Sequence, residues 1–249
     1  NYDTLAFQSP PRMNKPTKLL ITLAALQGIA GAAPVSITSS TLTYTQSFDT
    51  LPTATAAWTN DSTIPGWFAQ INNVNPFAGS AQVSDGTGTA LTGLLNLGAT
   101  ASTDRALGSK ATGTGNVANI AYAVSFQNNS TKPVTLSELK YTGELWRTNT
   151  GSGTPAVAVD ERYTVFFQVS GAPITSILLG GSSVMAAAGT GFTALGAAAN
   201  WVNPLNSPLG TSLDGNASAN RSTVTVNPAN VLLLPGQFLM IKWTDANEA

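Results

Sequence analysis

Apolar and polar side chains alternate with a period of two along several stretches of this chain, and no other sequence feature constrains its fold as strongly. The stretches cover residues 120–126, 139–145, 163–169, 224–226 and 238–243. A β-strand places successive side chains on opposite faces of a sheet, so the alternation predicts strands with one buried face and one wet face. Such half-buried strands pair mostly in antiparallel sheets.

Turn-forming dipeptides separate these stretches. They include Pro65-Gly66, Asp85-Gly86, Asp214-Gly215 and Pro235-Gly236, each of which favours a tight turn. Many short strands with regular turns predict an all-β fold, and we expect one antiparallel β-sandwich of jelly-roll type. Residues 184–199 are rich in alanine and glycine. They predict either a short helix or a loop, and the glycines favour the loop.

Composition excludes several classes of function. The chain has no cysteine and no histidine, which excludes disulfides, zinc sites built on those residues and catalytic triads that need histidine. Charged residues make up 9% and the formal net charge is −1. Because there is no basic block, we expect no nucleic-acid partner.

The N-terminal region predicts export. Met13 has the position of a start residue, Lys15 and Lys18 follow it, residues 19–29 are apolar, and residues 30–32 form an A-x-A cleavage site. This is the pattern of a Sec-type signal peptide over residues 13–32. The apolar part is shorter than the ~20 residues of a membrane span. A buried amphipathic helix is the alternative, although the two lysines stand where a signal peptide has them.

These boundaries divide the chain into three parts. Residues 1–12 are interpreted as an upstream, non-native segment outside the fold, residues 13–32 as the signal peptide, and residues 33–249 as a single mature β-sandwich domain. We expect no transmembrane segment in the mature chain and a secreted or cell-surface location.

Several motifs, taken in order, resemble a bacterial family. The chain resembles the exported N-terminal β-sandwich region of PEP-CTERM surface proteins, which are sorted by an exosortase. The matching segments are residues 48–52, Trp58, and residues 62–68, 102–109, 141–147, 213–221, 234–237 and 242–247.

The resemblance implies a secreted or surface-anchored, jelly-roll-like bacterial domain without an established activity. It also implies a last strand and a sorting tail beyond Ala249, so that residues 33–249 would form a domain that is incomplete at its C-terminal end.

The sharpest polar and aromatic cluster is Glu144, Trp146 and Arg147. If residues 138–147 form one strand, Glu144 and Trp146 lie on its polar face and Arg147 on its apolar face. A buried arginine needs a partner, so one interpretation is a structural ion pair, with Arg105, Arg147 and Arg221 as its candidate cations. The other interpretation is a saccharide site whose candidate residues are Trp67, Glu144 and Trp146.

Two further types of site are compatible with the sequence. Asp49, Asp214 and Asp245 are candidate ligands of a structural calcium ion, the one cofactor that the sequence suggests, whereas residues 214–216 also fit an Asx turn. A glycosidase needs two carboxylates about 5–9.5 Å apart. Glu138 and Glu144 would lie ~20 Å apart on a strand, and only a cross-strand pair such as Glu144 with Asp245 would meet the requirement. The five tryptophans are expected to pack in the core or rim rather than form a binding platform.

The sequence therefore predicts a non-catalytic secreted or cell-surface module with a structural, matrix or adhesive role. The alternative is a carbohydrate-binding module that accompanies a larger extracellular hydrolase, and a catalytic domain using carboxylates ranks third. The partners expected are extracellular polysaccharides or other envelope components.

Overall fold

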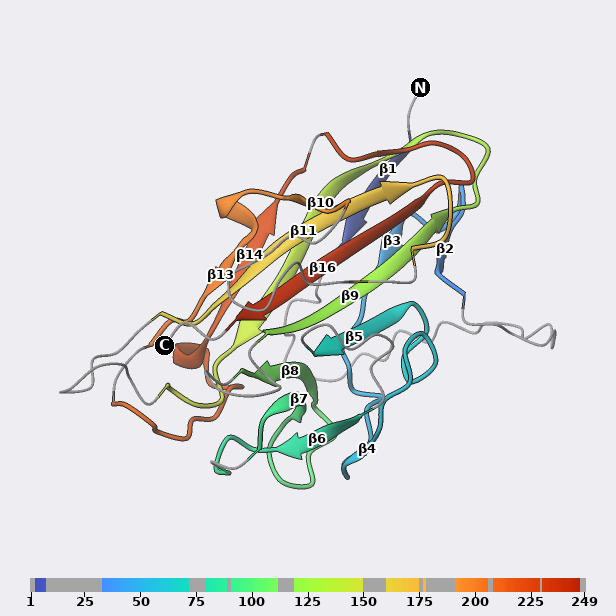
Figure 1. The fold of residues 1–249 in the computed structure, drawn as a ribbon. Coiled ribbons are helices and arrows are strands. Elements are labelled where there is room, and N and C mark those ends of the chain that lie inside the picture. The colour runs from blue at the N-terminus through green and yellow to red at the C-terminus, as the bar shows by residue number, and fades with distance from the viewer. Residues whose placement is uncertain are drawn as a thin grey trace.

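Two facing β-sheets form the body of the molecule, and a third, smaller sheet lies at one end (Figure 1). The computed structural model of the chain describes residues 3–7, 33–71, 79–88, 91–111, 119–149, 160–174, 177, 191–205, 208–228 and 230–246. The predicted signal peptide, residues 13–32, lies outside the described residues.

The first sheet has the strand order β14-β10-β1-β3. Its strands are β14 (Arg221–Val226), β10 (Val134–Glu144), β1 (Asp3–Phe7) and β3 (Thr43–Tyr44), and β15 (Leu232–Leu233) also pairs with β10. The pairs β10–β14 and β10–β15 are antiparallel, whereas β1 runs parallel to both β10 and β3. Strand β1 falls in the segment that the sequence places upstream of the mature chain, and that assignment stays a prediction.

The second sheet has the order β12-β11-β16-β9-β2. It contains β12 (Thr193–Ala194), β11 (Arg162–Ser170), β16 (Phe238–Ala246), β9 (Asn119–Asn128) and β2 (Val35–Ile37), with β13 (Trp201–Val202) paired to β11 and β5 (Trp67–Ile71) paired to β9. All of its pairs are antiparallel except β2–β9.

The small sheet has the order β4-β6-β7-β8, formed by β4 (Ala56–Ala57), β6 (Ser80–Ser84), β7 (Gly93–Leu97) and β8 (Ala106–Lys110). Pairing is antiparallel except between β6 and β7. Two 3₁₀ turns, η1 (Ala197–Ala199) and η2 (Ser218–Asn220), complete the described elements. No helix in the described part of the chain has the length and hydropathy of a membrane span.

The predicted all-β, sandwich-like fold is confirmed, and each of the five alternating stretches contains a strand. The jelly-roll connectivity stays a prediction. Within residues 184–199, the described part, 191–199, forms β12 and η1 rather than an α-helix. Residues 184–190 lie outside the described residues.

The main core fills the space between the two large sheets. Alternate residues of the central strands point into it, such as Leu136 of β10, Val124 of β9 and Ile241 of β16. Aromatic rings continue this core toward the small sheet: Trp243 stacks on Trp67, with ring centroids 5.9 Å apart. Burial of this apolar area is the main stabilising contribution in a chain without disulfides.

The prediction of one wet face is wrong for the central strands of the second sheet. Their outer face is covered by a second apolar cluster that includes Phe166, Ile174, Ile177, Phe192 and Met240. Ile174, Ile177 and Phe192 all come from beyond β11 in the chain and pack on this face, so β9 and β16 are buried on both sides. The alternating pattern identifies two faces, but it does not reveal a covering segment.

Candidate functional site

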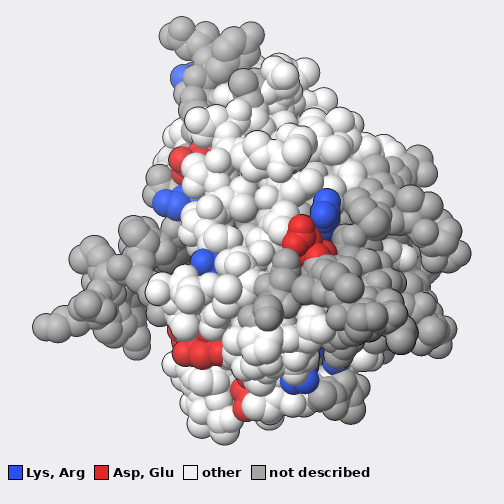
Figure 2. Space-filling model, turned by 90° about the vertical axis from the view of Figure 1, so that its left-hand side faces the viewer, with Lys and Arg blue, Asp and Glu red and all other residues white. Residues whose placement is uncertain are grey.

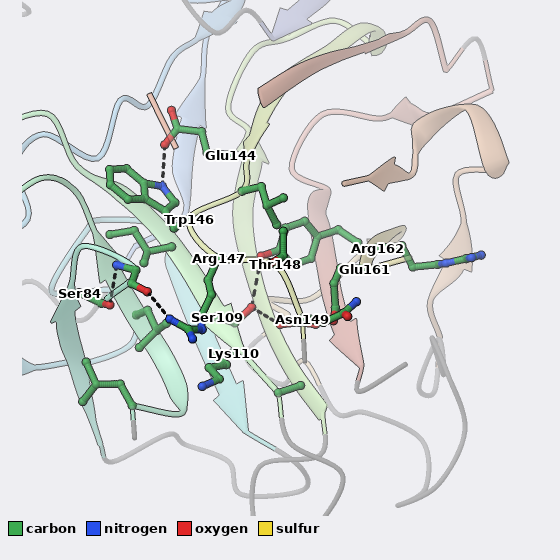
Figure 3. A pocket seen from close by; sticks show the side chains of 18 of the residues that line it. Ser84, Ser109, Lys110, Glu144, Trp146, Arg147, Thr148, Asn149, Glu161 and Arg162 are labelled. Carbon is green, nitrogen blue, oxygen red and sulfur yellow. Dashed lines mark hydrogen bonds between the residues drawn. The ribbon is translucent and has the colours of Figure 1, made fainter. Parts of the chain in front are cut away.

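A cavity of about 260 Å³ lies where the small sheet meets the end of the sandwich (Figure 3). Its walls come from the ends of β6, β8, β10 and β11, from β13 and from the residues that follow β10. The polar and aromatic residues that line it include Ser109, Lys110, Glu144, Trp146, Arg147, Thr148, Asn149, Glu161, Tyr163, Trp201 and Asp245. Cavities that bind small molecules combine apolar walls with a few polar groups in this way.

Trp146 and Glu144 form one wall. β10 ends at Glu144, so the expectation of a single strand over residues 138–147 is wrong at its C-terminal end. The indole Nε1 of Trp146 donates a hydrogen bond to Glu144 Oε2 (3.1 Å), and the ring is buried. It packs flat against Gly215, where an added Cβ would lie 2.3 Å from Nε1. Glycine at that position therefore lets the tryptophan close the wall.

Arg147 ties the small sheet to the loop that precedes η2. Its Nη1 donates to the carbonyl oxygen of Gly86 (3.1 Å) and its Nη2 to that of Gly210. Gly86 has a φ of +83°, and a Cβ there would collide with the Trp146 carbonyl at 2.0 Å, so the contact requires glycine. Thr148 Oγ1 adds a hydrogen bond to the Pro208 carbonyl (2.6 Å). The cavity rim is thus fixed by main-chain contacts.

Tyr163 and Trp201 form the opposite aromatic wall. Their rings stack with centroids 5.5 Å apart, and Tyr122 packs edge-on against Tyr163. Trp201 is 3% exposed and lies against Gly143 of β10. Among the described residues its Nε1 has no hydrogen-bond partner. A buried donor without an acceptor is rare and costs about 1–3 kcal/mol, and this nitrogen is itself closed to solvent. Trp201 therefore contributes its ring, and not its N–H, to the cavity wall.

The charged groups of the cavity differ in how they are held. Ser109 Oγ donates to Asp245 Oδ2 (2.5 Å) and lies 3.5 Å from the hydroxyl of Tyr163. Burial raises the pKa of Tyr163 above its ordinary range, and the Asp245 carboxylate raises it further. On the other side, burial lowers the pKa of Lys110, and the positive charge of Arg147 lowers it further. The site therefore holds two cations close together.

A smaller cavity of about 100 Å³ adjoins the first and shares Glu144, Leu97 and Tyr163 with it. Trp67 lines this second cavity. It is buried, and its Nε1 donates to the Tyr44 hydroxyl (2.7 Å). Of the three predicted saccharide-site residues, the structure therefore brings Glu144 and Trp146 together in the larger cavity and places Trp67 next to it. Asp245, the candidate cross-strand partner of Glu144, lines the same larger cavity.

The three candidate ion-pair arginines do not form one cluster. The guanidinium of Arg105 is buried and donates to the Asn96 side chain (2.7 Å from Nε) and to main-chain oxygens of Asn96 and Ala99. The hydrogen bonds of Arg147 go to carbonyl oxygens. Arg221 begins β14 directly opposite Glu144 in the strand register. Carbonyl and amide oxygens thus take the place expected for carboxylates at Arg105 and Arg147.

The three candidate calcium ligands are likewise held apart. Asp214 Oδ1 accepts a hydrogen bond from the main-chain N–H of Asn216 (2.9 Å). This is the Asx turn that the sequence offered as the alternative to a calcium site. Asp49 Oδ1 accepts the Arg105 amide (3.2 Å), and Asp245 is buried in the cavity. Within the described residues, no group of three or more acidic side chains could hold a metal ion.

We expect a chelator to leave the melting temperature unchanged. The physical reason is that the carboxylates of Asp49, Asp214 and Asp245 have separate local partners. A calcium ion at a hundred times its Kd would add about 2.7 kcal/mol of stability, so its removal would lower Tm by several degrees. Thermal unfolding with and without EDTA, followed by calcium addition, checks this. A calcium-reversible fall in Tm would contradict it.

All five tryptophans, Trp58, Trp67, Trp146, Trp201 and Trp243, are buried. The prediction that they pack in the core or rim is confirmed, and an exposed tryptophan pair on a sheet face, the platform that would favour surface binding of a glycan, is not formed. Figure 2 shows one face of the molecule, on which charged side chains are few and scattered among uncharged ones. The cavity is therefore the most distinctive polar and aromatic feature of the described part.

Sequence reasoning missed Lys110, Glu161, Tyr163 and Trp201 as site residues. Tyr163 belongs to a predicted strand, where it has the pattern of an ordinary core aromatic, and Trp201 follows a segment without clear periodicity. Each cavity tryptophan packs on a glycine elsewhere in the chain, Trp146 on Gly215 and Trp201 on Gly143. A single sequence does not reveal such pairs, so no signal was available for these residues. Comparison of the chain with protein-family models, with curated proteins and with solved structures finds no match.

Proposed function

We propose that this chain is a non-catalytic secreted or cell-surface module that holds a saccharide in the cavity between the small sheet and the sandwich. One observation carries the proposal: a preformed cavity of about 260 Å³ whose walls include three aromatic side chains, Trp146, Tyr163 and Trp201, together with the hydrogen-bond donors of Lys110 and Arg147. Saccharides present apolar ring faces and many hydroxyl oxygens, and that combination matches aromatic walls with hydrogen-bond donors.

The size and rigidity of the site support this class of ligand. The cavity, at about 260 Å³, lies just below the ~300–1,000 Å³ range of small-molecule sites, which suits a small ligand such as a single sugar ring. Arg147 and Thr148 fix its rim through carbonyl oxygens of two separate loops. A preformed site loses little conformational entropy on binding. A structural, matrix or adhesive role on an exported module would follow from holding such a ligand.

Trp201→Phe tests the proposal. It replaces the indole by a smaller ring and so shortens the aromatic wall, and we expect the affinity for a bound saccharide to fall about two- to tenfold, as for the loss of part of one aromatic contact. The measurement is isothermal titration of the full chain with neutral and acidic mono- and disaccharides.

Trp243→Phe is the matched control. Trp243 is also a buried tryptophan that packs among aromatic rings, but it lines only the smaller cavity, so the affinity should stay unchanged. No binding to any saccharide of the panel would overturn the proposal. Release of reducing sugar that is lost in Glu144→Gln would overturn its non-catalytic part.

A further inference from the structure

The charges of the larger cavity are distributed unevenly. Figure 3 shows Lys110 and Arg147 next to one another at the end of the cavity away from Glu144. Glu144 already accepts the Trp146 indole N–H and Asp245 already accepts the Ser109 hydroxyl. The third carboxylate of the lining, Glu161, and the third cation, Arg162, lie on the other side of the cavity from Lys110 in the same view.

Arg147 retains donors for a ligand. A guanidinium has five N–H donors. In Arg147, one N–H of Nη1 binds the carbonyl of Gly86 and one N–H of Nη2 binds the carbonyl of Gly210. For the remaining N–H groups, the described part of the chain supplies no further hydrogen bond. Because the two carbonyls fix the plane of the guanidinium, these donors are preorganised, which is the arrangement that suits an oxygen pair such as a carboxylate.

Lys110 adds a second positive charge beside the guanidinium of Arg147. Burial of the amino group lowers the pKa of Lys110, and the positive charge of Arg147 lowers it further. Two like charges held close together repel one another, and an opposite charge between them reduces that repulsion. An anionic group at this end of the cavity would therefore be stabilised by both cations and would gain charge-assisted hydrogen bonds.

We infer that the cavity selects a saccharide that carries a carboxylate, a uronic acid, with the carboxylate between Lys110 and Arg147 and the sugar ring against Trp146 and Trp201. The inference rests on the proposed function, since it names the class of saccharide that the same site would take. A neutral sugar would occupy the aromatic part of the cavity and would not relieve the repulsion between Lys110 and Arg147.

The test titrates the full chain with three probes: glucuronic acid, glucose, which lacks only the carboxylate, and acetate, which lacks the ring. We expect glucuronic acid to bind about ten- to a hundredfold more tightly than glucose, and this preference to shrink as salt is raised. In Lys110→Gln the affinity for glucuronic acid should fall about tenfold more than the affinity for glucose. Arg147→Lys keeps the positive charge but removes the paired N–H donors of the guanidinium. It should also weaken the preference for glucuronic acid over glucose.

Each other outcome has a distinct meaning. Equal binding of glucuronic acid and glucose overturns this inference and leaves the proposed function standing. Acetate binding as tight as that of glucuronic acid overturns the role of the ring, because the site would then be a simple anion site. A preference for glucuronic acid that persists in folded Lys110→Gln and Arg147→Lys overturns the placement of the carboxylate. No binding of either sugar overturns both proposals.

Discussion

Replacing Lys242 by methionine should raise the free energy of unfolding at pH 7 by about 1–2 kcal/mol. Lys242 lies on β16, is 0% exposed, and belongs to the outer, covered face of the second sheet. Its Nζ lies 3.9 Å from the ring centroid of Phe192 and 5.3 Å from that of Phe166. Methionine is unbranched like lysine and fills the same volume without a charge.

Burial lowers the pKa of Lys242 from 10.5 to about 8. A difference of this size corresponds to about 3 kcal/mol of penalty on the charged form in the folded chain. The two contacts with phenylalanine rings offset about 1–2 kcal/mol of the gain from the substitution, because each contributes about 0.5–1 kcal/mol. The penalty is the larger quantity, so the substitution should stabilise the protein.

The lowered pKa of Lys242 also determines how the free energy of unfolding changes with pH. Between pH 8 and 10.5 the unfolded chain binds the Lys242 proton and the folded chain does not, so stability rises with pH over this interval. Burial also raises the pKa of Tyr122, Tyr141 and Tyr163 above 10. The folded chain then holds those protons more tightly, and stability falls above about pH 10. We expect a maximum of stability near this pH.

Urea unfolding at about pH 7, 8, 9 and 10 measures both effects. Lys242→Met should be more stable at the lowest pH, and its stability should no longer rise with pH over this series. Lys132→Met is the matched control, since Lys132 is exposed and its replacement should change stability by less than about 0.5 kcal/mol. A destabilised Lys242→Met, or an unchanged rise with pH, would contradict the prediction.

Gly143→Ala should destabilise the chain by about 2–3 kcal/mol and reduce ligand affinity. A Cβ at Gly143 would lie 2.3 Å from Cε2 and Nε1 of Trp201 and 2.5 Å from Cδ1. The indole is rigid and 3% exposed, so it cannot yield without moving into Tyr163 or out of the cavity. Alanine restricts the unfolded chain and would by itself add about 0.4–1 kcal/mol of stability. Overpacking costs about 1–3 kcal/mol or more and outweighs this gain.

Gly171→Ala is the control for this substitution. Nothing lies within 4 Å of a Cβ at Gly171, which follows β11 on the surface, so the change should be neutral or slightly stabilising. Unfolding in urea gives the two stabilities, and near-ultraviolet circular dichroism reports the environment of the tryptophans. Equal stabilities of the two variants would show that Trp201 does not rest on Gly143.

The strands and part of the site could be predicted from the amino-acid sequence alone. Alternation predicted β9, β10, β11, β14 and β16 because a half-buried strand leaves a period-two pattern wherever it lies in the fold. Glu144 and Trp146 were predicted as neighbours because residues two positions apart in an extended chain lie on the same face. The Asx turn at Asp214 was also predicted, since its partner is two residues away.

Which faces are covered and which distant segments meet depends on the tertiary structure. Lys242 alternates with apolar residues and has the pattern of a solvent-facing lysine, yet Ile174, Ile177 and Phe192 cover that face. Lys110, Arg147 and Trp201 come from three separate parts of the chain and meet where the small sheet docks on the sandwich. Local periodicity records which side of a strand is apolar, whereas the pairing of sheets and the path of loops depend on contacts between residues far apart in sequence, which no local pattern encodes.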